Sequence, residues 1–284
     1  MCIDLHTHSL YSDGSNTPAE LVDLAVRNGL RVLALTDHDT MDGVAELVEA
    51  GRQAGLVTLP GVEISTTLRG HTLHLLGYGI DVDDSDLHRW LEPLQEGRVK
   101  RNLQILDKLR DLGIDISLEE VQAVSPSGQT GRPHIAQVLM TKGVVGSFSE
   151  AFQRYLGKNK SAWAGRFCYT PAEAIAALHR AGGIAVLAHP VQIDQSLRIL
   201  PAIIAELALR GLDGIECFYP THTRTIRKKL SAIAQKHGLL ITGGSDYHGP
   251  GRPNHPLAGS GKGFCPPYAL MEELGSRLGI PFEP

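Results

Sequence analysis

Short apolar segments recur along the chain, and most of them end in histidines or carboxylates. The run 31–36 (RVLALT) is followed by Asp37 and His38, and the run 184–188 is followed by His189. Runs of this length, apolar at nearly every position, are typical of parallel strands that are buried on both faces. In a barrel of alternating strands and helices, functional groups lie at the carboxyl ends of the strands. The pattern therefore predicts an α/β barrel whose polar groups gather at one rim.

Helix-start signals separate these apolar runs. The tetrapeptide TPAE occurs at 17–20 and again at 170–173. It combines a capping threonine, a proline at the first helical position and a glutamate that closes a capping box. Together with the apolar spacing that follows each signal, the pattern predicts helices at 17–28, 41–55, 170–182, 195–210, 223–237 and 268–278.

Residues 81–166 interrupt this alternation. The segment 84–113 is long and charged, with leucines at roughly helical spacing, and further helix signals lie at 117–120, 133–142 and 147–156. We expect an all-helical insertion between two barrel strands. The predicted organisation is a first part of the barrel at 1–80, the helical insertion at 81–166 and a second part of the barrel at 167–284.

The composition excludes several classes of protein. With 27 Lys+Arg against 31 Asp+Glu, the net charge of −4 does not favour long duplex nucleic acid as a partner. No apolar run is long enough to span a bilayer, and no secretion signal is recognisable at the amino terminus, so we expect a cytoplasmic protein without a membrane partner. The cysteines are widely spaced and form no C-x-x-C motif, which predicts reduced thiols and neither a zinc knuckle nor a disulfide framework. They are Cys2, Cys168, Cys217 and Cys265.

Imidazole and carboxylate side chains are concentrated at the expected strand ends. His6 and His8 are two residues apart, a spacing that puts both on one face of a strand. Alone, such a pair is more often merely solvated, but the chain supplies many similar groups. Nitrogen and oxygen ligands without thiolate suit Mn²⁺, Zn²⁺ or Fe²⁺, and the set is too large for one ion. The strand-end groups are His6, His8, Asp13, Asp37, His38, Glu63, His74, His189, Asp246 and His248.

In this order, the motifs H-x-H, T-D-H-D, G-x-E, A-H-P and S-D-x-H resemble those of the polymerase and histidinol phosphatase (PHP) family of phosphoesterases. The resemblance covers 1–80 and 170–249 and implies a distorted (β/α)7 barrel with an all-helical insertion. The segments 130–134 (TGRPH) and 215–222 (IECFYPTH) are similar to the branch described as 3′,5′-nucleoside bisphosphatases or small-RNA 5′-exonucleases.

The resemblance also implies the ligands of two or three divalent metal ions, with Mn²⁺ expected before Zn²⁺ or Fe²⁺. It assigns to a first ion His6, His8, Glu63 and Asp246. It assigns to a second ion Glu63 as the bridge, His74 and His189. It assigns to a third ion Asp13, His38 and His248. The implied chemistry is metal-assisted hydrolysis, in which the ions lower the pKa of the attacking water and offset charge on the phosphoryl oxygens.

Two further residues are candidates for a part in catalysis. Asp37 either orients a ligand histidine or caps the following helix, and we favour the first role. The resemblance makes His222 a candidate for protonating the leaving group or contacting phosphate, although a lone loop histidine is usually inert. Tyr219 and Phe218 are candidates for stacking on a base, and a core role for Phe218 is the alternative.

The insertion supplies the candidate substrate-binding residues. Arg132 and His134 lie at a Gly-Arg-Pro turn that opens a helix, where a phosphate can also accept hydrogen bonds from free backbone N–H groups. Lys158, Lys160 and Arg166 lie where the insertion returns to the barrel, and Arg166 is the best candidate among them. The alternative for all of these is a solvated basic side chain without a ligand.

The expected activity is removal of the 3′-phosphate from 3′,5′-bisphosphonucleosides, with a small phosphorylated nucleotide as the substrate. Alternatives are 5′-to-3′ degradation of short RNA, hydrolysis of histidinol phosphate, and a metal-binding module without turnover. A missing ligand would indicate the last, and no motif position lacks one. Amide hydrolysis of the amidohydrolase type usually needs a lysine among the ligands, and the motifs contain none.

Overall fold

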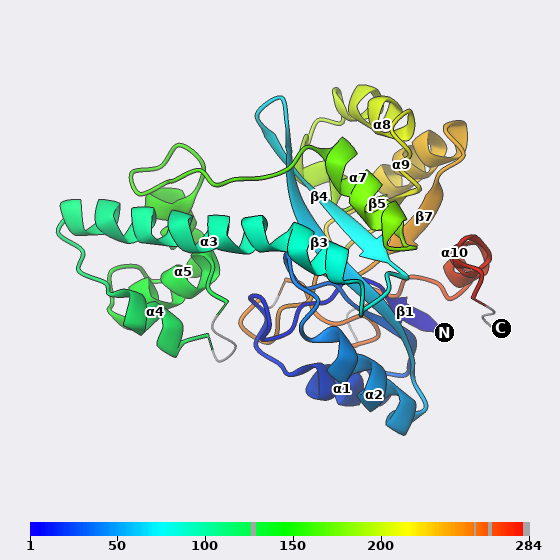
Figure 1. Ribbon diagram of the computed structural model, residues 1–284, viewed down its shortest axis with the longest axis horizontal. Helices are drawn as coiled ribbons and strands as arrows, with labels where there is room; N and C mark the ends of the chain where they lie inside the picture. The colour runs from blue at the N-terminus through cyan, green and yellow to red at the C-terminus, as the bar shows by residue number, and fades with distance from the viewer. Residues whose placement is uncertain (126–128, 253, 261–262, 281–284) are drawn as a thin grey trace.

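Seven strands form one mixed sheet in chain order (Figure 1). The structure, a computed structural model, describes residues 1–125, 129–252, 254–260 and 263–280. Neighbouring strands are parallel except around β4, which is antiparallel to both β3 and β5. The α/β fold predicted from the sequence is confirmed. The strands are β1 (Cys2–Asp4), β2 (Leu30–Leu35), β3 (Val57–Leu68), β4 (His71–Tyr78), β5 (Ile184–Leu187), β6 (Gly214–Phe218) and β7 (Leu240–Gly243).

The β3–β4 connection breaks the alternation of strand and helix. Only Arg69 and Gly70 join the two strands, and both have positive φ angles, of 49° and 79°. Such angles are typical of two-residue hairpin turns. Because no helix carries the chain back, β4 runs antiparallel to β3, and the pair forms the long ribbon that crosses the centre of Figure 1.

The first and last strands of the sheet lie side by side at their carboxyl ends. The amide of Leu5 donates to the carbonyl of Gly243 over 3.2 Å, and the amide of Asp246 donates to the carbonyl of His6 over 2.8 Å. The amide of His8 then donates to the carbonyl of Tyr247 over 2.9 Å. These hydrogen bonds join the two edges of the sheet, so the strand ends face a common centre.

An apolar cluster fills the barrel below these strand ends. Helix α10 (Leu270–Leu278) contributes Met271 and Leu274 to it, so this helix covers the end of the barrel opposite the polar rim. Every strand except β6 contributes at least one buried side chain to this cluster. Those from the strands include Ile3, Val32, Leu59, Leu76, Val186 and Leu240.

The predicted capping boxes are confirmed. In each TPAE segment the threonine side chain accepts from the glutamate amide, and the glutamate side chain accepts from the threonine amide. These segments open α1 (Pro18–Arg27) and α7 (Pro171–Arg180), whose apolar faces pack on the sheet. The other helices that surround the barrel are α2 (Val44–Ala54), α8 (Leu200–Ala208) and α9 (Arg224–Lys236).

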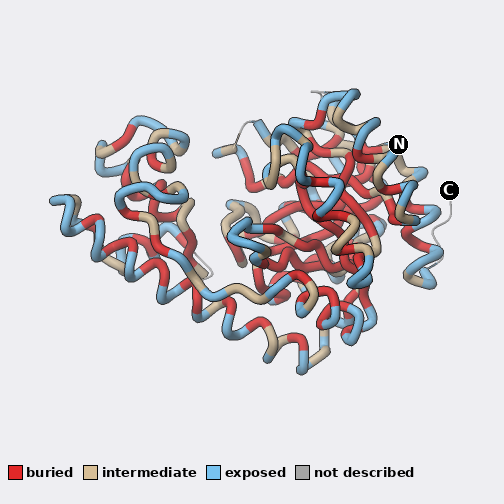
Figure 2. Tube along the Cα trace, turned by 90° about the horizontal axis from the view of Figure 1, so that it is seen from above, coloured by how far each residue is buried: buried red, intermediate tan, exposed pale blue. Residues whose placement is uncertain are grey.

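The chain between β4 and α7 forms helices that stand to one side of the barrel (Figures 1 and 2). Their buried apolar residues form a separate cluster, which includes Ile105, Leu109, Ile135 and Leu139. The predicted long helix is α3 (Ser85–Asp111), whose amino-terminal half packs against the barrel through Leu87, Leu91 and Leu94. The others are α4 (Leu118–Ala123), α5 (Arg132–Thr141), α6 (Phe148–Ala151) and a π-helical turn (Phe152–Leu156).

The prediction of four reduced thiols is wrong for one pair. Cys2 and Cys265 form a disulfide, with Cα atoms 5.0 Å apart, whereas Cys168 and Cys217 are free. The amide of Ile3 donates to the carbonyl of Pro266 over 3.0 Å, which aligns the carboxyl-terminal segment with β1. Sequence spacing did not indicate the pair, because the two cysteines are 263 residues apart and only the folded chain brings them together.

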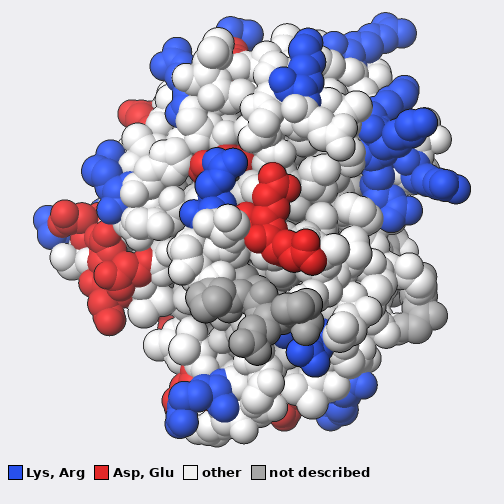
Figure 3. All heavy atoms as spheres, turned by 90° about the vertical axis from the view of Figure 1, so that its right-hand side faces the viewer, with Lys and Arg blue, Asp and Glu red and all other residues white. Residues whose placement is uncertain are grey.

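Within the described residues, no helix combines the length and apolar character needed to cross a membrane. Figure 3 shows the face turned away from the helical insertion. On this face, acidic and basic side chains lie in separate groups between uncharged residues, and a large basic group lies at the upper right edge.

Gly244 provides a test of the contact between the ends of β1 and β7. A Cβ atom at this position would overlap the backbone and Cβ of His6. We expect Gly244→Ala to lower the free energy of unfolding by about 1–3 kcal/mol, measured by urea denaturation, because a packed backbone cannot move aside cheaply. Gly251→Ala is the control, since no atom lies within 4 Å of its added Cβ. Equal stability of the two variants would contradict the close approach of these strands.

Candidate metal centre

All nine predicted metal ligands lie at the same end of the barrel. The antiparallel β3–β4 pair contributes two of them from within its strands, and the others follow strand ends. They are His6 and His8 after β1, Asp13 in the next loop, His38 after β2, Glu63 in β3, His74 in β4, His189 after β5, and Asp246 and His248 after β7.

The ligand atoms form four overlapping groups, in each of which they lie within 4.8 Å of one another. His6 and Glu63 each belong to two groups, as do His8 and His38, so the groups form one connected cluster. The groups are His8, Asp13, His38 and His248; His6, Glu63 and His189; His6, His8 and Asp246; and His38, Glu63 and His74. The group around Asp13 matches the predicted ligands of the third ion, with His8 in addition. Glu63, predicted for the first ion, lies beside the His6–His8–Asp246 group. Its Oε1 is 3.5 Å from His6 Nε2, and its Oε2 is 3.4 Å from His8 Nε2.

Many atoms of this cluster are buried and lack a hydrogen-bond partner. Such atoms are rare in proteins, because an unpaired buried polar atom costs free energy. Seven of the nine predicted ligands each place one such nitrogen or oxygen atom in the cluster. Divalent ions that bind nitrogen and carboxylate oxygen would satisfy these atoms. The atoms are His6 Nε2, His8 Nε2, Asp13 Oδ1, His38 Nδ1, Glu63 Oε2, His189 Nδ1 and His248 Nε2.

The electrostatics of the cluster suit metal binding. Burial raises the pKa of Glu63, but the surrounding imidazoles, with a hydrogen bond from His189, outweigh it and hold that pKa well below the usual value. Burial lowers the pKa of His38 to about 3. At neutral pH the carboxylate is therefore ionised and the His38 imidazole is neutral, which are the protonation states that a metal ion requires. The neighbouring carboxylates raise the pKa values of His6 and His189, so a metal ion bound there would displace protons from these two rings.

Glu216 supports two predicted ligands and was not predicted. His6 Nδ1 donates to Glu216 Oε1 over 3.0 Å, and the His189 amide donates to Oε2 over 2.7 Å. With Nδ1 held by Glu216, the Nε2 of His6 faces the cluster and is the atom that a metal ion would bind. The only signal in the sequence was an acidic residue inside the apolar strand β6.

Asp37 orients the loop that follows β1. Its side chain accepts from the amide and hydroxyl of Ser9 and from the hydroxyl of Ser12, and the Ser12 hydroxyl lies 3.4 Å from His8 Nδ1. Asp37 therefore acts on His8 through Ser12. It does not cap α2, whose amino end has no side-chain cap.

Tyr219 is fixed against the cluster. Its hydroxyl donates to Asp246 Oδ2 over 2.8 Å and accepts from Gln192 Nε2 over 2.9 Å. Only 2% of Tyr219 is exposed, so its ring is not open to a base as one alternative supposed. Burial and the neighbouring Asp246 raise the pKa of Tyr219, which keeps the hydroxyl protonated as a donor.

His222 lies beside Tyr219, with ring centroids 5.1 Å apart. Its Nδ1 donates to the Cys217 carbonyl over 3.0 Å, and its buried Nε2 has no hydrogen-bond partner. Burial lowers the pKa of His222, so the ring is neutral at neutral pH. In this tautomer His222 offers a lone pair at Nε2 rather than the proton that the predicted general acid would need.

A second cluster, of arginines, borders the first where the insertion meets the barrel. Asp39, next to His38 in the sequence, accepts from Arg98 Nε over 2.7 Å and from Arg166 Nη1 over 2.9 Å. Arg101 and Arg132 complete this arginine cluster. Burial and the neighbouring guanidinium groups lower the pKa values of Arg98, Arg101 and Arg132, whereas Asp39 raises the pKa of Arg166. No carboxylate other than Asp39 makes an ion pair with these four side chains among the residues that the structure describes.

Arg132 and Arg166 were predicted, whereas Arg98 and Arg101 were missed. Both missed arginines lie on the buried face of α3, between apolar positions. A charged residue on an apolar helix face was therefore the available signal. Burial lowers the pKa of Arg132 to about 10, which leaves it charged at neutral pH.

The other predicted substrate-binding residues differ in position. His134 Nδ1 accepts from the Gly131 amide over 3.0 Å and so caps α5. Lys158 Nζ donates to the Gly70 carbonyl in the β3–β4 turn over 2.6 Å, and the structure does not bring it to the arginine cluster. Arg252, which was not predicted, donates to Asp13 Oδ2 over 2.8 Å from the segment that follows His248.

Comparison with known proteins agrees with this geometry. Residues 4–108 match the family profile described as PHP domain. A 5′-3′ exoribonuclease of Haemophilus influenzae is 36% identical over 247 residues, which cover 87% of this chain and 90% of that protein. A 3′,5′-nucleoside bisphosphate phosphatase of Chromobacterium violaceum is 34% identical over 250 residues, or 88% of each chain.

A solved structure has the same fold. A protein of Bifidobacterium adolescentis, assigned as a metal-dependent phosphoesterase, superposes with a TM-score of 0.87 at 31% identity and covers 96% of this chain and 95% of that chain. These similarities place the chain in the class of metal-dependent phosphoesterases. Within that class it belongs to the PHP family.

The role of Glu216 can be tested by metal affinity. We expect Glu216→Gln to weaken Mn²⁺ binding about 10–100-fold, because partners that orient ligand histidines typically contribute that much. The measurement is a metal titration of the purified protein. The control is Glu49→Gln, which changes an exposed carboxylate on α2. An affinity equal to that of the parent protein would rule out a supporting role for Glu216.

Proposed function

We propose that the protein removes the 3′-phosphate from 3′,5′-bisphosphonucleosides, with two or three divalent ions, Mn²⁺ first among them, held by the predicted ligands. The observation that carries this proposal is the contact between two centres of different chemistry. His38 faces the candidate metal centre, and the adjacent Asp39 holds Arg98 and Arg166 of the arginine cluster. A substrate with two phosphates on one ribose matches this pair of centres.

The candidate metal centre would receive the phosphate that reacts. Bound divalent ions supply a water of lowered pKa and offset negative charge on the phosphoryl oxygens. Glu63 and Asp246 would contribute carboxylate oxygens, and the imidazoles around them would contribute ring nitrogens. Glu216, Tyr219 and Asp37 hold these side chains in place through the hydrogen bonds described above, which reduces the reorganisation needed during the reaction.

The arginine cluster would bind the phosphate that does not react. Guanidinium groups bind phosphate oxygens through paired, charge-assisted hydrogen bonds. Two buried arginines, Arg98 and Arg101, two half-buried ones, Arg132 and Arg166, and one ionised carboxylate leave an excess of positive charge, which a phosphate dianion would offset. The name of the Chromobacterium violaceum relative supports this choice of substrate.

The ligand assignment predicts loss of turnover when Asp246 is removed. We expect Asp246→Ala and His74→Ala to lower kcat more than about 100-fold, since the loss of a ligand should exceed the effect of a residue that only supports one. Phosphate release from a panel of nucleotides and sugar phosphates with Mn²⁺ is the measurement. Asp86→Ala is the control, because 86% of that side chain is exposed. If the parent protein released no phosphate from any 3′,5′-bisphosphonucleoside, the proposed activity would be rejected.

The arginine cluster predicts an effect on binding. We expect Arg132→Ala to raise KM for a 3′,5′-bisphosphonucleoside about 10–100-fold with little change in kcat, because a hydrogen bond to a charged group contributes about 1.5–3 kcal/mol. A nucleoside 3′-monophosphate, which lacks the 5′-phosphate, should show no such change. The control variant is the exposed Arg89→Ala. An equal effect on both substrates would contradict the assignment of the 5′-phosphate.

Stepwise removal of 5′-nucleotides from short RNA is the second candidate function. The activity named for the Haemophilus influenzae relative supports it. It requires cleavage of the same bond between the 3′-oxygen and phosphorus, so one centre would serve both reactions. A 5′-phosphorylated oligoribonucleotide labelled at its 3′ end separates the two functions.

A further inference from the structure

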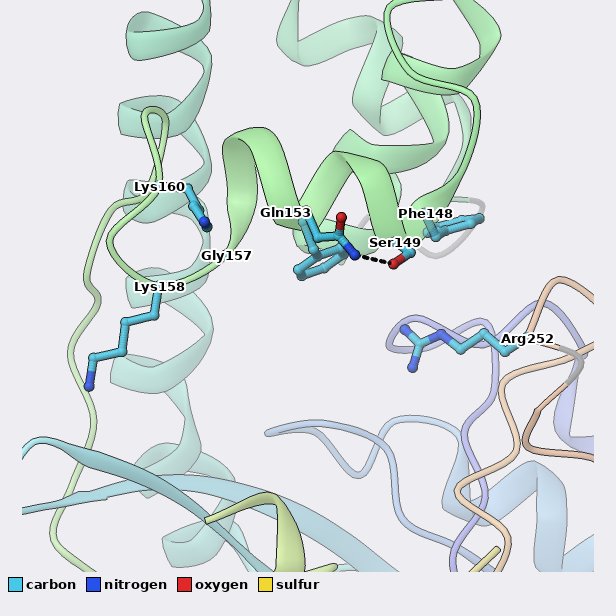
Figure 4. A pocket seen from close by; sticks show the side chains of 8 residues that line it. Phe148, Ser149, Gln153, Gly157, Lys158, Lys160 and Arg252 are labelled. Carbon is cyan, nitrogen blue, oxygen red and sulfur yellow. Dashed lines mark hydrogen bonds between the residues drawn. The ribbon is translucent and has the colours of Figure 1, made fainter. Parts of the chain in front are cut away.

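A cavity of about 510 Å³ separates the insertion from the barrel loop that carries Arg252 (Figure 4). Phe148, Phe152 and Gln153 line it from α6 and the π-helical turn. Lys160 lines it from the segment that follows, and Arg252 closes it from the barrel. Cavities of a few hundred cubic ångströms with aromatic walls and a few polar groups are typical of small-molecule sites.

Both sides of this cavity connect to the centres already described. Arg252 Nη2 is 2.8 Å from Oδ2 of Asp13, a candidate metal ligand. On the insertion side, the Arg132 guanidinium lies over the Phe152 ring, 5.6 Å from its centroid. The cavity therefore lies next to both the candidate metal centre and the arginine cluster.

The residues that line the cavity favour an anionic ligand. They include Lys158, Lys160 and Arg252 and no acidic residue. Lys158 is held at the β3–β4 turn, and in Figure 4 it extends away from Gln153 and Phe148. Lys160 is exposed, and its ammonium group has no partner among the residues that the structure describes. The two phosphates of a bisphosphonucleoside already match the other two centres, so these cations suit a third.

We propose that this cavity is a subsite for the second nucleotide of a short single-stranded nucleic acid, whose first nucleotide lies in the bisphosphate site. The base would pack against Phe148 and Phe152, and the phosphate on the 3′ side of the second nucleotide would lie near Lys160 and Arg252. Aromatic faces for bases and cations for the backbone are the usual means of binding single strands. This inference rests on the proposed function for the placement of the first nucleotide.

The test is the affinity for a 5′-phosphorylated trinucleotide of RNA with a fluorescent label at its 3′ end, measured by anisotropy on the full protein with Ca²⁺ in place of Mn²⁺. We expect Phe148→Ala and Lys160→Glu each to raise Kd by roughly fivefold or more. Neither change should alter KM for a 3′,5′-bisphosphonucleoside. The controls are Leu209→Ala and Lys229→Glu, two exposed residues outside this cavity, which should leave the trinucleotide Kd unchanged.

Lys160→Glu keeps the test decisive if Phe148→Ala weakens folding, because Phe148 also packs on the apolar cluster of the insertion and Lys160 does not. Unchanged trinucleotide affinity in Lys160→Glu, or an equal change in bisphosphonucleoside KM, would overturn the subsite. The binding measurement does not depend on turnover. The two proposals can fail separately. If the protein binds the trinucleotide tightly, Lys160→Glu weakens that binding and no bisphosphate is hydrolysed, the proposed phosphatase activity is rejected and the subsite is retained.

Discussion

The buried carboxylate of Glu63 is the constraint on which the site depends. Its Oε1 lies 2.9 Å from both His74 Nδ1 and His189 Nε2, and its Oε2 lies 2.6 Å from His38 Nδ1. An ionised carboxylate removed from water is stable only beside positive charge or strong hydrogen-bond donors. The strands that meet around Glu63 therefore have to supply groups that share a cation with it or donate to it.

The hairpin of β3 and β4 makes this arrangement possible. Glu63 pairs with Leu76 and Ser65 pairs with His74, so Glu63 and His74 lie diagonally on the same face of the hairpin. Both candidate ligands of this hairpin lie within its strands, whereas the ligands of the other strands follow the strand ends. The antiparallel strand brings a side chain from its middle, which explains why β4 carries a candidate ligand within the strand itself.

Asp39 joins the barrel chemistry to the insertion. Its backbone adopts a positive φ of 57°, and its amide donates to the Glu63 carbonyl over 2.9 Å. This turn directs His38 into the candidate metal centre and the Asp39 carboxylate toward Arg98 and Arg166. Gln95 of α3 donates to the Asp39 carbonyl over 3.0 Å, which adds a second link. Two neighbouring residues thus align the two centres to which one substrate would bind.

Local signals in the sequence determined most of the fold. Capping boxes and apolar runs depend on neighbours within a few residues, so the helices that follow TPAE and the strands that end in histidine were predictable. The helical insertion was predictable for the same reason. The candidate ligands were recognisable because they sit in short motifs at those strand ends.

Only the tertiary structure decided which distant groups meet. Glu216 contacts His6, Arg98 contacts Asp39, and Cys2 is bonded to Cys265, although each pair is separated by tens to hundreds of residues. None of these residues belongs to a local motif that names its partner. The physical reason is that closure of the sheet and docking of α3 set these distances, and both depend on packing of the whole chain rather than on any one segment.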